Sequence, residues 1–295
     1  MIRTNVKSIG DPFVLLHGGR YYMYATSASD GFLYWESEDM QNWEQGGYCY
    51  SNPTWGYECF WAPEVFHLNG KFYLLYTARW SKNQSLRIGL AVADSPKGPF
   101  IDLKDEPLFD FGYAAIDATI FVDDDGKHYM YYSKDCSENI INGVHTSEIY
   151  GCEISSDLLT ILSEPVKITT PDMPYEQFSG PDWLWNEGPF VIKHNGKYLL
   201  NYSTNCYGDK HYSLGVAQSE SPLSGFKKYS KAVLTYEHAE SDFSGPGHNC
   251  IFRGKDGNLY TAFHIHTYED KPSGDRKAVI ARVGFADNGE LQILL

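Results

Sequence analysis

The chain has 295 residues, 16% of them aromatic, and a formal net charge of −14 at pH 7. This charge argues against a nucleic-acid partner, because nucleic-acid binding gains most of its affinity from Lys and Arg at phosphates. The first 13 residues lack the apolar stretch of a secretory signal, and no run of about 18 apolar residues could cross a bilayer. We therefore expect a cytoplasmic protein with no membrane partner, or a secreted one if a leader has been removed.

Five segments share one pattern, in which a strand-like apolar run meets a tight glycine turn and returns as a run rich in tyrosine. Asn-Gly and Asp-Gly turns between alternating apolar stretches favour β-hairpins, because glycine readily takes positive backbone angles. The turn glycines are Gly19, Gly70, Gly126, Gly196 and Gly257. A third strand-like segment follows each hairpin, at residues 32–37, 88–94, 148–155, 213–219 and 278–285, and a short closing stretch comes after it.

Units of four strands at intervals of roughly 50 to 70 residues are typical of propeller blades, which bury their faces against their neighbours. The sequence thus predicts an all-β fold, a five-bladed β-propeller with four-stranded antiparallel blades around a central axis. Residues 1–295 are expected to form a single domain, since no linker-like stretch divides them. Irregular stretches at 81–86, 135–146, 170–185 and 267–276 are expected to be loops that build a binding surface.

The residues that open the five runs carry the chemistry: Asp11, Trp61, Asp117, Glu187 and His248. Four of them lie nine positions before the turn glycine, and Asp11 lies eight before Gly19. A ring of repeats would bring this shared position to one place near the axis. Taken alone, Asp11 could simply start an Asp-Pro turn and Glu187 could be a loop acid, whereas Asp117 lies among apolar residues, where an unused charge is costly.

Three convergent carboxylates favour either a metal site or the hydrolysis of an acetal. A cage for a hard cation would need more oxygen ligands close together. Glycoside hydrolysis needs one carboxylic acid to protonate the leaving oxygen and one carboxylate to direct the attacking water. A third carboxylate beside the acid would raise its pKa and keep it protonated near neutral pH. The pattern therefore favours a glycosidase.

The ordered motifs resemble those of glycoside hydrolase family 43 over essentially the entire chain. They are D-P-F-V at 11–14, S-E-D-M-Q-N-W at 37–43, W-A-P-E-V at 61–65, I-D-A-T-I-F at 116–121, N-E-G-P at 186–189 and G-P-G-H-N at 245–249. The resemblance implies a five-bladed propeller that hydrolyses arabinose- and xylose-containing plant polysaccharides with inversion.

The resemblance also implies roles for individual residues. Asp11 would be the general base, Glu187 the general acid, and Asp117 the residue that tunes and holds the acid. Trp61 would line the pocket and Arg276 would contact the sugar. His248 would lie on the axis beneath the sugar and, with waters, hold a calcium or other cation. The alternatives are a core aromatic for Trp61, a solvated loop residue for Arg276 and a hydrogen-bonded core residue for His248.

The expected substrate is an arabinose- or xylose-containing oligosaccharide. We expect exo action that removes terminal α-L-arabinofuranosyl or β-D-xylosyl units, with Trp80, Tyr113, Trp183 and Trp185 as candidates to wall off a short pocket. Three alternatives stay open. These are an endo-acting arabinanase of the same fold, a retaining five-bladed hydrolase, and a non-catalytic sugar-binding propeller.

Overall fold

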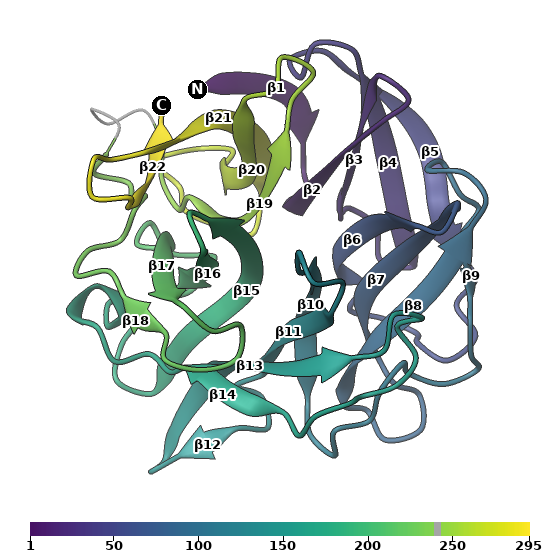
Figure 1. The fold of residues 1–295 in the computed structure, drawn as a ribbon, viewed down its shortest axis with the longest axis horizontal. Coiled ribbons are helices and arrows are strands. Elements are labelled where there is room, and N and C mark those ends of the chain that lie inside the picture. The colour runs from purple at the N-terminus through teal and green to yellow at the C-terminus, as the bar shows by residue number, and fades with distance from the viewer. Residues whose placement is uncertain (239–242) are drawn as a thin grey trace.

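The computed structural model describes residues 1–238 and 243–295, and strands dominate it (Figure 1). The one helix among these residues is a 3₁₀ turn, η1 (Pro174–Glu176). No helix in the described ranges is long and apolar enough to span a membrane. The fold is therefore all-β, as the sequence predicts.

Five consecutive groups of antiparallel strands follow one another along the chain. The first holds β2 (Gly10–His17), β3 (Arg20–Thr26), β4 (Gly31–Ser37) and β5 (Trp43–Ser51). The second holds β6 (Trp61–Leu68), β7 (Lys71–Arg79), β8 (Leu86–Ala93) and β9 (Ile101–Asp102). The third holds β10 (Ala115–Val122), β11 (His128–Lys134), β12 (Ile140–Ile141), β13 (Val144–Ile154) and β14 (Val166–Thr169).

The fourth group holds β15 (Trp183–His194), β16 (Lys197–Thr204), β17 (Ser213–Ser219) and β18 (Lys227–Lys228). The fifth holds β19 (Gly247–Arg253), β20 (Leu259–His266), β21 (Arg276–Phe285) and β22 (Leu291–Leu294), joined by β1 (Ile2–Lys7) from the other end of the chain. Since β1 pairs with β21, strands from both ends of the chain share one sheet, and Figure 1 shows the termini on the same side of the ring.

Strand pairing gives four sheets rather than five separate ones. The third and fourth groups form one nine-stranded sheet, because β13 and β15 pair in parallel over 145–147 and 183–185. Two of the segments predicted to be loops, 135–146 and 170–185, therefore supply strand residues. This junction holds the start of β15 beside the third group.

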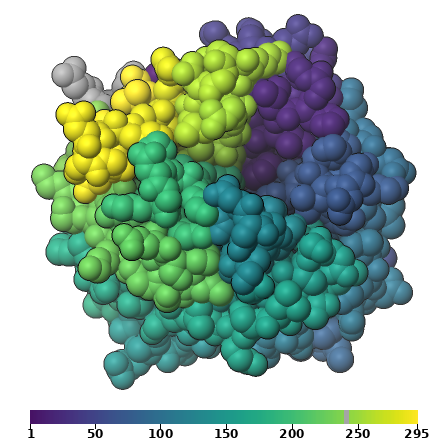
Figure 2. Space-filling view, in the orientation of Figure 1, coloured from purple at the N-terminus to yellow at the C-terminus, as the bar shows by residue number. Residues whose placement is uncertain are grey.

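The first strands of the groups contact one another in the order β2, β6, β10, β15, β19 and back to β2. They surround the middle of the molecule in Figure 1, and Figure 2 shows a hollow near the middle of the same face. Aromatic side chains fill much of the space between neighbouring sheets, with Tyr24, Tyr76, Tyr131 and Tyr202 essentially inaccessible to solvent. This packing makes the inner strands a rigid frame for a central site.

Each inner strand carries a β-bulge at the same place. In the first hairpin, two residues of the inner strand lie opposite a single residue of the second strand, between the pairs Gly10–Thr26 and Phe13–Tyr24. The same interruption recurs in the other four hairpins. The first bulged residue has a left-handed backbone in every group, with φ of 54° at Asp11, 46° at Ala62, 56° at Asp117, 55° at Gly188 and 51° at His248. A bulge bends the strand and redirects neighbouring side chains, so these residues are aimed away from the regular pleat.

Hydrogen bonds link each bulge to the preceding group and continue around the ring. The backbone N–H of the left-handed residue is the donor in each, and a polar side chain of the preceding group is the acceptor. The bonds run from Ala62 to Thr26 Oγ1 (2.9 Å), Asp117 to Thr77 Oγ1 (3.1 Å), Gly188 to Asp117 Oδ2 (3.2 Å), His248 to Ser203 Oγ (2.7 Å) and Asp11 to His264 Nδ1 (3.2 Å). The five bulges are therefore fixed relative to one another.

Candidate active site

A cavity of about 330 Å³ opens at the bulged ends of the inner strands. All six predicted site residues line it: Asp11, Trp61, Asp117, Glu187, His248 and Arg276. The first five come from five different strand groups, and Arg276 begins β21. The ring thus gathers residues that lie as far as 265 positions apart along the chain.

The predicted common register is off by one residue in two groups. Asp11, Asp117 and His248 are the left-handed bulge residues, but in the other two groups Ala62 and Gly188 hold that position. Trp61 and Glu187 lie one residue earlier, at the last regular pair before the bulge. Counting back from the turns misses this because the loops at Gly126 and Gly257 hold five residues and the other three hold two. The turn glycine therefore lies nine positions after the bulge residue in those two groups and eight positions after it in the others. The bulge still directs both kinds of position toward the cavity.

Asp11 is largely buried beside one guanidinium and two imidazoles. Its Oδ1 is 3.1 Å from Arg276 Nη1 and 3.3 Å from His248 Nδ1, and its Oδ2 accepts a 2.6 Å hydrogen bond from Thr26 Oγ1. Burial alone would raise the pKa of the Asp11 carboxyl, but His248, Arg276, His264 and the Thr26 hydrogen bond together hold it well below its usual range. Asp11 is therefore ionised at neutral pH.

The environment of Glu187 has the opposite effect. Burial is the main reason why its pKa is raised to about 8, and the charges of Asp11 and Asp135 add to this. A 2.7 Å hydrogen bond from the Tyr212 hydroxyl to Oε1 opposes the shift. Glu187 therefore keeps its proton at neutral pH, which makes it available as an acid.

Asp117 is 8% exposed, and burial and repulsion from Glu187 raise its pKa well above the usual value. Its Oδ2 accepts a hydrogen bond from the backbone N–H of Gly188, the residue after Glu187. Asp117 is thus attached to the backbone that carries Glu187 and interacts with its charge.

Tryptophan lines two parts of the cavity wall. Trp61 packs against Leu86 and Ile116, so it joins the second and third groups as well as facing the cavity. Trp185 faces the cavity, and Trp183 stacks against it with ring centroids 6.0 Å apart. Of the other aromatic candidates, Trp80 is buried, and none of Trp80, Tyr113 and Trp183 is among the lining residues. Trp80 and Tyr113 were wrong as candidates for the pocket wall, and Trp183 contributes only by stacking on Trp185.

The residues around His248 fit a protein-held calcium poorly. Its Nδ1 faces Asp11, whose carboxylate already contacts Arg276 and Thr26. The described ranges contain no group of three or more His, Cys, Asp or Glu residues that could hold a metal. Calcium prefers six to eight oxygen ligands, so water would have to supply nearly all of them. We therefore derive no catalytic step through a cation.

The cavity also contains polar residues that we did not predict from the sequence, among them Thr26, Arg79, Asp135 and Tyr212. Thr26 is the residue paired opposite the first bulge, and Asp135 directly follows β11. The tyrosine-rich second strands gave a weak signal for such positions, because each has a polar residue paired with the residue just before the bulge: Thr26, Thr77, Ser133, Ser203 and His264. Tyr212 had no comparable signal.

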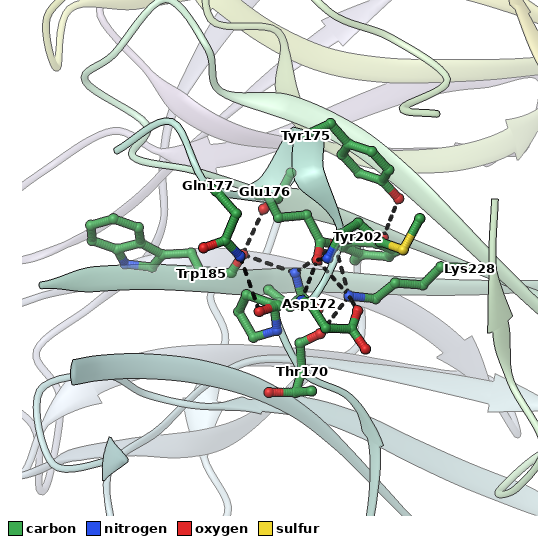
Figure 3. Close-up of polar contacts among 12 residues, drawn as sticks. Thr170, Asp172, Tyr175, Glu176, Gln177, Trp185, Tyr202 and Lys228 are labelled. Carbon is green, nitrogen blue, oxygen red and sulfur yellow. Dashed lines mark hydrogen bonds and ion pairs between the residues drawn. The ribbon is translucent and has the colours of Figure 1, made fainter. Parts of the chain in front are cut away.

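Behind Glu187, a buried polar cluster holds the same strand (Figure 3). Glu176 has no exposed surface, and its carboxylate accepts hydrogen bonds from Asn186 Nδ2 (3.1 Å), the Tyr202 hydroxyl (2.8 Å) and Lys228 Nζ (2.7 and 2.8 Å). Side chains alternate along a strand, so Asn186 faces this cluster while Trp185 and Glu187 face the cavity. The cluster therefore holds the acid-bearing strand from behind.

Comparisons of the sequence and of the structure with known proteins all find glycoside hydrolases. The family model described as glycosyl hydrolases family 43 matches residues 6–291. A solved structure of a thermostable family-43 glycoside hydrolase is 47% identical, with a TM-score of 0.94, covering 99% of this chain and 96% of that one.

Two relatives carry names that state an activity. The β-D-galactofuranosidase xynD of Aspergillus niger is 26% identical over 299 residues, which cover 95% of this chain and 81% of the relative. Xylosidase/arabinosidase 43A of Humicola insolens is 33% identical over 224 residues, 65% of each chain. The family match, with the site geometry described above, shows that this chain belongs to glycosyl hydrolase family 43 and is a glycoside hydrolase.

Proposed function

We propose that this protein is an inverting, exo-acting glycosidase that removes terminal α-L-arabinofuranosyl or β-D-xylosyl units from hemicellulose or pectin oligosaccharides. The observation that carries the proposal is the presence in one cavity of a carboxyl with a lowered pKa, Asp11, and one with a raised pKa, Glu187. Environments that separate two carboxyl pKa values in this way assign a base and an acid.

In this mechanism Glu187 donates its proton to the glycosidic oxygen as the bond to the anomeric carbon breaks. Asp11 accepts a proton from a water molecule that attacks the same carbon from the opposite face. The attack inverts the anomeric configuration, for which the two carboxyls would be about 6.5 to 9.5 Å apart. Solvent then returns a proton to Glu187 and removes one from Asp11. Asp117 tunes Glu187 and, through Gly188, positions it.

The size of the cavity supports exo action. About 330 Å³ is near the lower end of the range for small-molecule pockets, as expected for a site that holds one terminal sugar. Residues at a bulge or directly before it line the cavity from all five groups, which supports the inference that the groups are the blades of a five-bladed propeller forming one domain. The xylosidase/arabinosidase name of a relative supports a pentose as the terminal sugar.

A galactofuranosyl unit is the second candidate, because a relative aligned over 95% of this chain is named a β-D-galactofuranosidase. The β-D-galactofuranosyl and α-L-arabinofuranosyl rings have the same configuration and differ in the length of the exocyclic arm. A cavity that accepts one ring therefore needs only extra space at that arm to accept the other.

The test is hydrolysis of 4-nitrophenyl α-L-arabinofuranoside, β-D-xyloside and β-D-galactofuranoside, with the product anomer recorded by NMR. We expect a pentoside to be cleaved with inversion, and Asp11→Ala and Glu187→Ala to abolish activity while circular dichroism shows an unchanged fold. Wild-type turnover by either variant, or net retention, would refute the assignment. Release of long oligomers from arabinan would instead indicate endo action.

A cation at His248 is a separate proposal, based only on the family resemblance. Elemental analysis of the purified protein tests it directly. A bound cation that is lost in His248→Ala would support the proposal, and a metal-free active enzyme would contradict it.

A further inference from the structure

Asp135 is a buried carboxylate at the cavity that the mechanism above does not use. It directly follows β11, is 7% exposed and lines the cavity with Glu187 and Asp117. Its charge reaches both of these carboxyls, since it contributes to the raised pKa of each. Asp135 therefore lies close to the place where the bond is cleaved.

The two oxygens of Asp135 have different environments. Oδ1 accepts a 2.9 Å hydrogen bond from the backbone N–H of Ser137, which fixes the turn after β11. The contact of Oδ2 is the Cys136 thiol at 3.8 Å, a long and weak interaction. Within 1–238 and 243–295, no Lys, Arg or His forms an ion pair with this carboxylate, and the arginines of the cavity are used elsewhere, Arg276 by Asp11 and Arg79 by Glu58.

A buried carboxylate oxygen without a strong donor is costly unless a ligand supplies one. Sugar hydroxyls are such donors. The depth of Asp135 indicates which sugar: at 7% exposure it lies on the inner wall, whereas Trp185, which also lines the cavity, is only partly buried. The unit that occupies the inner part of an exo-acting site is the terminal sugar that is released.

We propose that Asp135 is a specificity-determining residue whose Oδ2 accepts a hydrogen bond from a ring hydroxyl of the terminal sugar. The proposal rests on the proposed function. It deepens that function, because Asp135 favours the binding of sugars that carry a hydroxyl facing this wall over the corresponding deoxy sugars. A site built to accept a hydroxyl group discriminates strongly against an analogue that lacks it.

The test uses Asp135→Asn, because this substitution keeps one oxygen of Asp135 as an acceptor and replaces the other. The Asn carbonyl oxygen can still accept from Ser137 and keep the turn, whereas its NH₂ group replaces an acceptor by a donor at the Oδ2 position. Asp157→Asn is the matched control. Asp157 also accepts a backbone hydrogen bond two residues on, from Leu159, but is exposed and does not line the cavity.

For each protein, kcat/KM is measured on the preferred 4-nitrophenyl glycoside and on its 2-deoxy and 3-deoxy analogues. We expect Asp135→Asn to reduce kcat/KM about 10- to 100-fold on the parent glycoside, the loss expected for a hydrogen bond to a charged group. On the analogue lacking the partner hydroxyl, Asp135→Asn and wild type should differ less than about threefold, because the interaction is already absent. Asp157→Asn should match wild type on all three.

Two results would overturn the proposal: unchanged kcat/KM on the parent glycoside, or an equal loss on all three glycosides. The equal loss, accompanied by a basic limb of the pH profile at lower pH, would mean that Asp135 acts only through its charge on Glu187. Failure of the proposed function gives a different result, a wild type that cleaves none of the glycosides. Calorimetric titration with L-arabinose and D-xylose then decides on Asp135. Weaker binding by Asp135→Asn supports the inference, and equal or undetectable binding overturns it.

Discussion

At the scale of single residues, the neighbours of the two central carboxyls separate their chemistry. Both side chains are largely removed from water, and this alone would raise the pKa of each. Asp11 has Arg276 and two imidazoles beside it, whereas Glu187 has two other carboxyls within range of its charge. Activity should therefore fall as pH rises through about 8, where Glu187 loses its proton, and should persist well into the acid range, where Asp11 stays ionised.

Replacing Tyr212 by Phe tests the control of the acid. The Tyr212 hydroxyl donates to Glu187 Oε1, a bond that favours the ionised carboxylate, and its ring stacks on His264. In Tyr212→Phe the stacking remains but the pKa of Glu187 rises further, so the basic limb of the pH profile moves to higher pH. We expect kcat/KM at pH 6 to fall about tenfold, as for one lost hydrogen bond. A basic limb that stays in place or moves to lower pH would contradict this.

Replacing Arg276 by Gln tests the control of the base. The guanidinium lowers the pKa of Asp11 and also that of Glu187, so its loss should move both limbs of the profile to higher pH. We expect about a 100-fold or greater loss of kcat/KM at pH 5, because the base loses the charge that keeps it ionised and the ion pair that holds it in place. Arg282→Gln is the control, since Arg282 lies on the same strand but is exposed. An unchanged acid limb in Arg276→Gln would exclude this role.

At the scale of elements, the bulge in each inner strand is the feature that makes the site. A regular strand would send alternate side chains to opposite faces, whereas the left-handed residue interrupts the pleat at the rim of the cavity. Gly188 shows why the fourth group has glycine at this position. A Cβ there would be 3.1 Å from the His248 ring, in addition to the strained φ of 55°. Glu187 can therefore occupy the preceding position with its backbone close to Asp117 and His248.

The buried polar cluster around Glu176 lies behind β15, and its contribution to stability can be predicted. Glu176→Gln removes the buried partner of Lys228, whose side chain is 8% exposed, and leaves the exposed Asp172 as its carboxylate partner. The substitution also places an NH₂ donor among the donors Asn186 Nδ2 and the Tyr202 hydroxyl. We expect the free energy of unfolding to fall by about 3–5 kcal/mol, as for one broken buried ion pair. Urea denaturation measures this loss.

The double variant Glu176→Gln, Lys228→Met is the control for this cluster. It should recover part of the stability, because no buried charge is left alone. In both the single and the double variant kcat should be lower than in wild type, since Asn186 has lost its charged partner. A loss below about 1 kcal/mol in the single variant would mean that the cluster does not hold the strand.

At the scale of the whole molecule, strand pairing resumes after each bulge at residues that meet in the centre of the ring: Phe13, Glu64, Thr119, Phe190 and Cys250. Phe13 and Phe190 have ring centroids 6.4 Å apart, and Glu64 is hydrogen-bonded to Thr119. Glu64 Oε2 is buried with no hydrogen-bond partner among the described residues. Burial raises the pKa of Glu64 to about 8, and the Thr119 hydrogen bond opposes this shift.

This central acid should make stability depend on pH. Because the folded-state pKa of Glu64 is above its unfolded value, its contribution is fully present below about pH 4.5 and is lost as pH rises to about 8. Relative to Glu64→Gln, wild type should therefore lose about 2–4 kcal/mol of unfolding free energy between pH 5 and pH 8. Urea denaturation at both pH values measures the difference, with the exposed Glu44→Gln as control. A difference independent of pH would show that Glu64 does not titrate in this range.

Local sequence determined the hairpins and the grouping of the site residues. Glycine turns between alternating apolar runs predicted the hairpins, and chemically active residues at the start of each run predicted a shared site, because turn propensity and strand alternation act over a few residues. The tertiary structure decided the one-residue shift that places Ala62 and Gly188, not Trp61 and Glu187, at the bulge. It also decided that Tyr212, Asp135 and Glu176 surround the acid and its strand. These features depend on contacts between distant segments, and no local pattern encodes which buried polar groups will meet when the ring closes.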